Sequence, residues 1–179
     1  MSRRRFRPTD AFVDESIRGD RYIMSCVLAE ARTLRDVRLS MAELALHGQV
    51  HFRKESVRRR PMLVAAISVL PVEAFAVVVK RAAGVSHEDA RRDGLSAIVE
   101  TLQEREVSRL TLDRTTVAGA DARTIRRVRS REPLLTFEHR ASRDEPMLWV
   151  ADGVAWAIGA RGPWPERLGA VLTKIVTLP

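Results

Sequence analysis

Three acidic residues each stand where an apolar run stops, and they lie far apart in the chain. They are Asp14 in FVDES, Asp113 in LTLDRT and Asp152 in WVADGVAW. A lone carboxylate inside an apolar core is unfavourable unless it is protonated or acquires a counter-charge. Acids at the rim of a core are therefore candidates to converge on a divalent cation, and carboxylate oxygens suit Mg²⁺ or Mn²⁺.

Each acid also has a simpler local explanation. Asp14 and Asp113 each follow a strand-like run, where aspartate often serves only as a turn former. Asp152 differs, because the helix expected around it is apolar on nearly every side, so its carboxylate requires a partner unless it caps the helix. Glu55, in HFRKES, precedes a helix and could interact favourably with the helix dipole alone.

The hydrophobic periodicity predicts strands alternating with helices. The first two strands form a hairpin around Gly19, and the order that follows predicts a mixed sheet with helices on both faces. The expected strands cover residues 11–15, 22–28, 50–52, 74–79, 107–113 and 134–139, and the expected helices cover 30–46, 56–70, 86–106, 119–132, 147–158 and 166–176.

The length of 179 residues predicts one domain, from residue 11 to 179, preceded by a basic flexible arm over residues 1–10. The 45% hydrophobic and 30% charged content is typical of a globular protein. The single cysteine, Cys26, cannot form a disulfide within the chain, which favours the reducing cytoplasm. Polar residues and a proline interrupt the longest apolar stretch, 62–79, so we expect no membrane span.

The charge balance points to a polyanionic partner. The net charge is +8, and only three of the 31 basic residues are lysines. Arginine pairs bidentately with phosphate, which favours nucleic acid, although a GC-rich genome would also enrich arginine. Aromatic residues amount to 5% of the chain, too few for an evident base-stacking platform, so duplex or structured nucleic acid is favoured over single strands.

The four motifs together resemble the ribonuclease-H-like fold, and specifically a bacterial family called domain of unknown function thirty-eight hundred. Its members typically open on a strand ending in I-D-E-S-G, carry a His-x-x-x-Glu-like middle motif and end on a helix of the type L-Q-x-A-D-x-x-A-Y-A. The resemblance spans residues 11 to 160 and ends here on L-W-V-A-D-G-V-A-W-A. This chain departs from the pattern at Ile17, where glycine is usual, and at Trp149, where glutamine is usual.

The resemblance implies an α/β fold with strand order 3-2-1-4-5, an opening antiparallel hairpin and helices on both faces. Asp14 would lie on the central strand and Asp152 on the C-terminal helix that packs at that end. Asp113 would lie on strand four if the run 74–79 is an insertion, and on strand five if that run is strand four. The sequence leaves these two assignments open.

If the acids meet, the expected activity is metal-dependent hydrolysis of DNA, RNA or a hybrid. Two cations held by shared carboxylates can activate water and stabilise the leaving oxygen of a phosphodiester. Asp14 is the expected bridging ligand, with Asp113, Asp152 and Glu55 as outer ligands. His51, Lys54 and Arg58 flank one helix start and are expected to contact the substrate phosphate.

Two other functions compete with a nuclease. The first is a non-catalytic module that binds nucleic acid or protein and retains the fold. The second is a receiver-like phosphoacceptor domain built on Asp14 and Glu15, which the opening hairpin disfavours. His139 is interpreted as a core histidine, although a proton-shuttle role is conceivable. The chain contains no phosphate-binding glycine loop, nucleophile elbow or zinc spacing.

Overall fold

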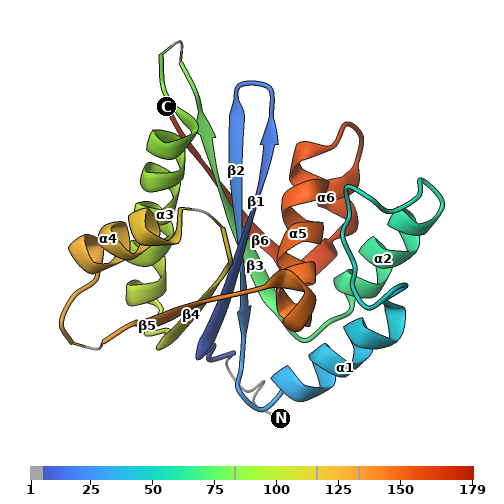
Figure 1. The fold of residues 1–179 in the computed structure, drawn as a ribbon. Helices are drawn as coiled ribbons and strands as arrows, with labels where there is room; N and C mark the ends of the chain where they lie inside the picture. The colour runs from blue at the N-terminus through green and yellow to red at the C-terminus, as the bar shows by residue number, and fades with distance from the viewer. Residues whose placement is uncertain (1–5, 83, 116, 133) are drawn as a thin grey trace.

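The computed structural model describes residues 6–82, 84–115, 117–132 and 134–179, which form one six-stranded mixed sheet covered by helices on both faces (Figure 1). The sheet order is β5-β4-β1-β2-β3-β6. The strands are β1 (Asp10–Arg18), β2 (Arg21–Ala29), β3 (Glu73–Lys80), β4 (Arg109–Asp113), β5 (Thr136–Arg140) and β6 (Leu172–Leu178). The helices are α1 (Leu34–Leu44), α2 (Arg59–Ser68), α3 (His87–Glu104), α4 (Ala118–Val128), α5 (Pro146–Gly159) and α6 (Trp164–Arg167), with 3-10 turns at Ser142–Asp144 and Gly169–Val171.

The opening hairpin is confirmed. β1 and β2 pair antiparallel over their whole length, from Asp10 opposite Ala29 to Arg18 opposite Arg21. Gly19 occupies the connecting turn with φ of 60°, a conformation that glycine adopts without the clash a Cβ would create.

The first five strands take the order 3-2-1-4-5 that the resemblance implies, but the third strand is not the one expected. Residues 50–52 form part of a loop, and β3 instead pairs antiparallel with β2. Val50 and Phe52 are buried in the core, so their apolar alternation reflects packing of a loop against α5. β4 pairs parallel with β1, which places Asp113 on strand four.

The C-terminal segment is a second correction. Residues 166–176 were expected to be helical, yet β6 runs parallel to β3 and adds a sixth strand at that edge. Its sequence LTKIVTL is rich in β-branched residues, which favour a strand over a helix. Only the short α6 and a 3-10 turn precede it.

Two hydrophobic cores lie on opposite faces of the sheet, as strand alternation requires. Phe12 and Ile23 belong to the core shared with α1, α2 and α5, whereas Val13 and Met24 belong to the core shared with α3 and α4. Figure 1 shows α3 and α4 on one side of the strands and α1, α2, α5 and α6 on the other. The apolar α5 packs directly against β1 and β2.

The residues preceding β1 are packed against the sheet from Phe6 onward. The Thr9 N–H donates to the Ala29 carbonyl at 3.0 Å, and the Arg109 N–H donates to the Thr9 carbonyl at 3.1 Å. Residues 1–5, which carry most of the expected basic arm, lie outside the described residues. Within the described part of the chain, no helix is long and apolar enough to cross a membrane.

Gly153 is the position where α5 approaches the loop 51–58 most closely, and its replacement should destabilise the fold. A Cβ there would lie 2.6 Å from both Ile67 Cδ1 and Phe52 Cε2. We expect Gly153→Ala to lower the free energy of unfolding by about 1–3 kcal/mol, the usual effect of overpacking. Urea denaturation of the variant and the wild type measures this difference in the free energy of unfolding.

Gly119→Ala is the matched control, because its Cβ would meet only Arg123 Nη1, at 3.8 Å. Alanine is the better helix former, so this variant should be neutral or more stable by up to about 1 kcal/mol. Equal free energies of unfolding for the two variants would contradict close packing at Gly153.

Candidate functional site

Asp14 and Asp113 lie side by side on two parallel strands at the centre of the sheet. Val13 stands in register with Leu112, and the two aspartates follow directly. Val13 and Leu112 both belong to the core under α3, so strand alternation turns both carboxylates toward the face that α5 covers. Both aspartates are half-buried.

Asp152 approaches the same place from α5. Ser25, which stands opposite Asp14 on β2, donates its hydroxyl hydrogen to the Ala151 carbonyl at 2.7 Å and so fixes α5 against the sheet. Asp152 Oδ2 accepts a hydrogen bond from the Phe52 N–H at 2.7 Å and lies 3.1 Å from His51 Nδ1. Asp152, for which the sequence suggested no partner, therefore has two hydrogen-bonding partners, both in the loop after α1.

The three aspartates are close enough to perturb one another. Burial raises the pKa of Asp14 well above its ordinary value, and the negative charge of Asp152 is the next largest cause. Asp113 adds a smaller effect in the same direction, and the Glu15 N–H, which donates to Asp14 Oδ1 at 2.7 Å, opposes the shift. Burial also raises the pKa of Asp113, with Glu15 and Asp152 contributing. The fold thus brings together acids that lie far apart in the sequence, at positions 14, 113 and 152.

Glu15 is the acid that the sequence interpretation did not include in the metal site. Its negative charge raises the pKa of both Asp14 and Asp113. Glu15 Oε2 forms an ion pair at 2.7 Å with Nη1 of Arg91, a buried arginine of α3 that also binds Asp121 through Nε and Nη2 at 2.7 and 2.9 Å. Its position directly after Asp14, at the end of a buried run, was the available signal.

Glu55 has a local partner. Arg59 Nε donates to Glu55 Oε2 at 2.7 Å, and Arg59 Nη2 donates to the Leu44 carbonyl at 2.7 Å. These contacts tie the start of α2 to the end of α1. Glu55 therefore stabilises the junction between α1 and α2 in this structure, whereas Glu15 is one of three carboxylates whose charge acts on Asp14.

The three expected phosphate contacts occupy different positions on the loop before α2. His51 borders the acids, and its hydrogen bond to Asp152 raises its pKa, against the effects of burial and of the positive charge on Lys54. Lys54 and Arg58 are both exposed, and Arg58 occupies the N-cap position of α2. Only His51 of these three residues contacts one of the three aspartates directly.

A cavity of about 280 Å³ opens beside the acids. Two carboxylates and three basic side chains line it, together with a serine, an isoleucine and a tryptophan. The lining residues are Glu15, Ser16, Ile17, Arg18, His51, Arg53, Asp152 and Trp156. A cavity that combines acids with cations at one rim can accept an anionic group whose charge a bound cation partly neutralises.

The donor types fit a divalent cation, although the side chains are not arranged around one. Carboxylate oxygens are the ligands that Mg²⁺ and Mn²⁺ prefer, and the raised pKa values of Asp14 and Asp113 show that a counter-charge would relieve repulsion. Among the described residues, however, no three His, Cys, Asp or Glu side chains are grouped so as to hold a metal ion. Asp152 and Glu15 are instead turned toward N–H donors and Arg91.

Comparison with known proteins gives similarity only at the level of structure. No protein-family model matches the chain, and no curated protein matches it by sequence. The crystal structure of Bst-RNase HIII in complex with Mn²⁺ is similar with a TM-score of 0.56 at 10% identity, over 86% of this chain and 52% of that chain. A point mutant of Bst-RNase HIII gives a TM-score of 0.50 at 8% identity, over 84% of this chain and 51% of the other.

This chain therefore spans about half the length of those two proteins. At such low identity the likeness is evidence for the fold alone. The mixed six-stranded sheet, its antiparallel opening hairpin and the helices on both faces identify the architecture as ribonuclease-H-like.

Proposed function

We propose that this protein is a metal-dependent nuclease that hydrolyses phosphodiester bonds of DNA, RNA or a hybrid. The observation that carries the proposal is the convergence of Asp14, Asp113 and Asp152 from two strands and a helix, where burial and the charge of Asp152 raise the pKa of both Asp14 and Asp113. Repulsion of this kind is unfavourable for folding and is commonly retained where it serves a site. The cavity beside the acids offers space for a substrate group.

Asp14 is proposed as the shared ligand, because the charges of Asp113, Asp152 and Glu15 all act on it. Asp113, Asp152 and Glu55 are proposed as the outer ligands, and in this structure Glu55 pairs with Arg59 as Glu15 pairs with Arg91. A divalent cation held by these carboxylates would activate water and stabilise the leaving oxygen.

The basic wall of the cavity is proposed to orient the scissile phosphate. His51 is held by Asp152 Oδ2, so its ring has a fixed direction relative to the acids. Arg18 and Arg53 line the same cavity, and arginine is well suited to phosphate oxygens. Lys54 and Arg58, exposed on the adjoining loop, are proposed to contact more distant phosphates of the same strand.

The structural likeness to Bst-RNase HIII, one structure of which contains Mn²⁺, agrees with this proposal at the level of the fold. This chain covers about half of Bst-RNase HIII, so the proposal does not assign the whole activity of that protein to this chain. Membership in the domain-of-unknown-function family thirty-eight hundred is part of the proposal and rests on the terminal motifs around Asp14 and Asp152.

Asp14→Asn should abolish Mn²⁺-dependent cleavage of labelled duplex substrates. Loss of a direct ligand should exceed the 10- to 100-fold effect usual for outer partners of a metal site, so we expect a fall of about 100-fold or more. The same variant should be at least as stable as the wild type without metal, because it removes a repelled charge. Gel assays and urea denaturation measure the two quantities.

Asp20→Asn, in the exposed hairpin turn, serves as the control and should cleave normally. Unchanged cleavage by Asp14→Asn, in a preparation without contaminating nuclease, would show that the carboxylate cluster is not the catalytic site.

The stability of the metal-free protein should fall as pH rises from about 4 toward neutrality. Burial and neighbouring acids raise the pKa of Asp14 in the folded state, so the folded chain keeps a proton that the unfolded chain has lost. This contribution to stability is fully present below the ordinary pKa of aspartate and is lost as pH rises from there through the raised pKa of Asp14. Denaturation across pH should show a shallower dependence for Asp14→Asn than for the wild type.

At neutral pH, Mn²⁺ should restore stability, by about 2.7 kcal/mol when its free concentration is 100 times Kd. Asp14→Asn should show a smaller gain at the same concentration. Identical melting curves with and without Mn²⁺ for the wild type would argue against a metal site at these acids.

A second candidate function is a non-catalytic nucleic-acid-binding module that retains the fold. Its supporting observation is that Asp152 and Glu15 are already engaged by N–H donors and by Arg91, with no metal-holding group among the described residues. This function predicts salt-sensitive binding that chelation does not change, without turnover. Cleavage by the wild type that is lost on chelation would favour the nuclease over this module.

A further inference from the structure

Helix α4 carries a set of arginines that lack acidic partners. Arg123, Arg126 and Arg127 are exposed on the helix, and Arg129 is its C-cap residue. In the described part of the chain, no carboxylate lies within ion-pair distance of any of them. The one acid of α4, Asp121, is buried and points toward Arg91 of α3.

Asp121 is fully occupied by other groups. Arg91 binds both of its oxygens, at 2.7 and 2.9 Å, and His139 Nε2 lies 3.0 Å from Oδ2. Arg91 in turn contacts Glu15 at 2.7 Å and the Tyr22 hydroxyl at 3.3 Å. The buried Asp121 is therefore bound by Arg91 and His139, and it forms no ion pair with the exposed arginines of α4.

A cavity of about 510 Å³ lies between α3 and α4. Arg123 and Arg127, one helical turn apart on α4, stand at its rim, whereas Arg92 of α3 is engaged by Asp89 and Asp93. The cavity is lined by Ser86, Glu88, Asp89, Arg91, Arg92, Ala120, Asp121, Arg123, Thr124 and Arg127. Like charges one turn apart on a helix repel, so an anion bound between Arg123 and Arg127 would relieve that repulsion.

The cationic surface continues past the cavity. The guanidinium groups of Arg126 and Arg129 lie 5.7 and 5.6 Å from the centroid of the Phe137 ring on β5. Arg129 is further fixed by a hydrogen bond to the Leu135 carbonyl at 2.7 Å. Stacking on an aromatic ring limits the directions that these side chains sample, which lowers the entropy lost when they bind phosphate.

We infer that α4 and the α3–α4 cavity form a surface that binds the phosphate backbone of duplex nucleic acid. A row of arginines along one helix matches a polymer with repeated phosphates better than a single small anion. The inference rests on the proposed function for its class of partner. It deepens that function by naming a surface separate from the acids.

The position of α4 also fits this role. Asp121 of α4 and Glu15, the residue after Asp14, share the guanidinium of Arg91, so α4 lies next to the candidate site on the α3 side of the sheet. The clustered acids repel phosphate, and cations at their border would hold the backbone while only the scissile group enters the site. Glu15 joins the two regions through Arg91.

Arg123→Gln with Arg127→Gln tests the inference by fluorescence anisotropy, using duplex DNA, duplex RNA and a hybrid of about 20 base pairs in EDTA. We expect about 10-fold weaker binding near 100 mM salt. The slope of the logarithm of the binding constant against the logarithm of the salt concentration should be smaller by about 2, one unit for each lost phosphate contact. Chelation prevents cleavage, so the measurement is independent of catalysis. Both substituted residues are exposed, and unchanged circular dichroism and melting temperature check the fold.

The matched control is Arg32→Gln with Arg35→Gln, which removes the same charge at the start of α1, on the other side of the sheet (Figure 1). The inference fails if the α4 variant binds as the wild type does or loses no more affinity than this control. It also fails if the wild type binds pyrophosphate at Arg123 and Arg127 but none of the duplexes. Weakened binding by the α4 variant together with an absence of Mn²⁺-dependent cleavage in the wild type would uphold this surface and overturn the nuclease.

Discussion

Mutual repulsion among carboxylates at the centre of the sheet is the constraint that the surrounding structure must satisfy. Asp14 is perturbed by Asp152, Glu15 and Asp113 at once, in a place where burial already disfavours its charge. Such a cluster persists only where each acid gains compensation from its surroundings. The Glu15 N–H serves Asp14, the Phe52 N–H serves Asp152, and Arg91 serves Glu15.

The compensation comes from elements that the fold brings in from both faces. On the α5 face, Ser25 anchors the Ala151 carbonyl, and the absence of a side chain at Gly153 admits the Phe52 ring. On the other face, Gly94 lets α3 approach β2, since a Cβ there would lie 2.9 Å from Met24 Sδ. Close packing on both sides thus delivers the donors that the acids need.

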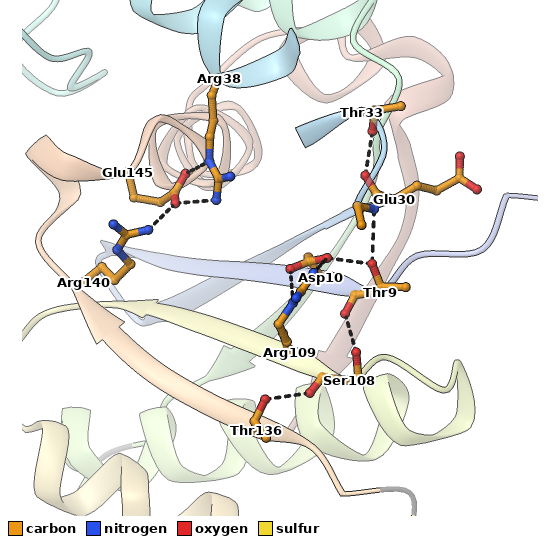
Figure 2. A network of polar contacts seen from close by, with 11 residues as sticks. Thr9, Asp10, Glu30, Thr33, Arg38, Ser108, Arg109, Thr136, Arg140 and Glu145 are labelled. Atoms are coloured by element: carbon orange, nitrogen blue, oxygen red, sulfur yellow. Dashed lines mark hydrogen bonds and ion pairs between the residues drawn. The ribbon is translucent and has the colours of Figure 1, made fainter. Parts of the chain in front are cut away.

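A second polar network supports α5 from its N-terminal end. Figure 2 shows Glu145, which is 1% exposed, held by Arg38 and Arg140. Glu145 also accepts the Met147 N–H at 3.1 Å, so one buried carboxylate caps the helix and ties it to α1 and β5. A similar pair of hydrogen bonds joins Arg109 to Asp10 at the start of β1 and β4. These contacts fix the axis of α5, and with it the position of Asp152.

The sequence predicted the parts of the fold that depend on local pattern. The hairpin, the strand that ends at Asp113 and the apolar helix around Asp152 follow from periodicity, and strand order followed from the motif resemblance. Residues 50–52 were misread because a buried loop and a short strand show the same alternation. Residues 166–176 were misread because amphipathic spacing outweighed the β-branched composition of β6.

The partners of the acids could not be read from the sequence, because they depend on tertiary packing. Nothing local distinguishes Arg91 from the adjacent Arg92, yet Arg91 is buried against Glu15 and Asp121 while Arg92 pairs with acids on its own helix. Glu55 was expected in the metal site on the strength of a motif, and its ion pair with Arg59, four residues further along the chain, is the local contact that the structure adds.

The division of charge over the molecule follows from the same constraint. A chain with a net charge of +8 brings four carboxylates together at the middle of the sheet and, in the part that the structure describes, leaves arginines without ion pairs on α4. A polyanion approaching the acids alone would be repelled, whereas cations placed around them attract it and limit how far it can enter. Because Arg91 pairs with both Asp121 and Glu15 beneath α4, neither acid forms an ion pair with the exposed arginines of that helix. One buried guanidinium therefore both holds a site carboxylate and separates the acidic centre from the basic surface.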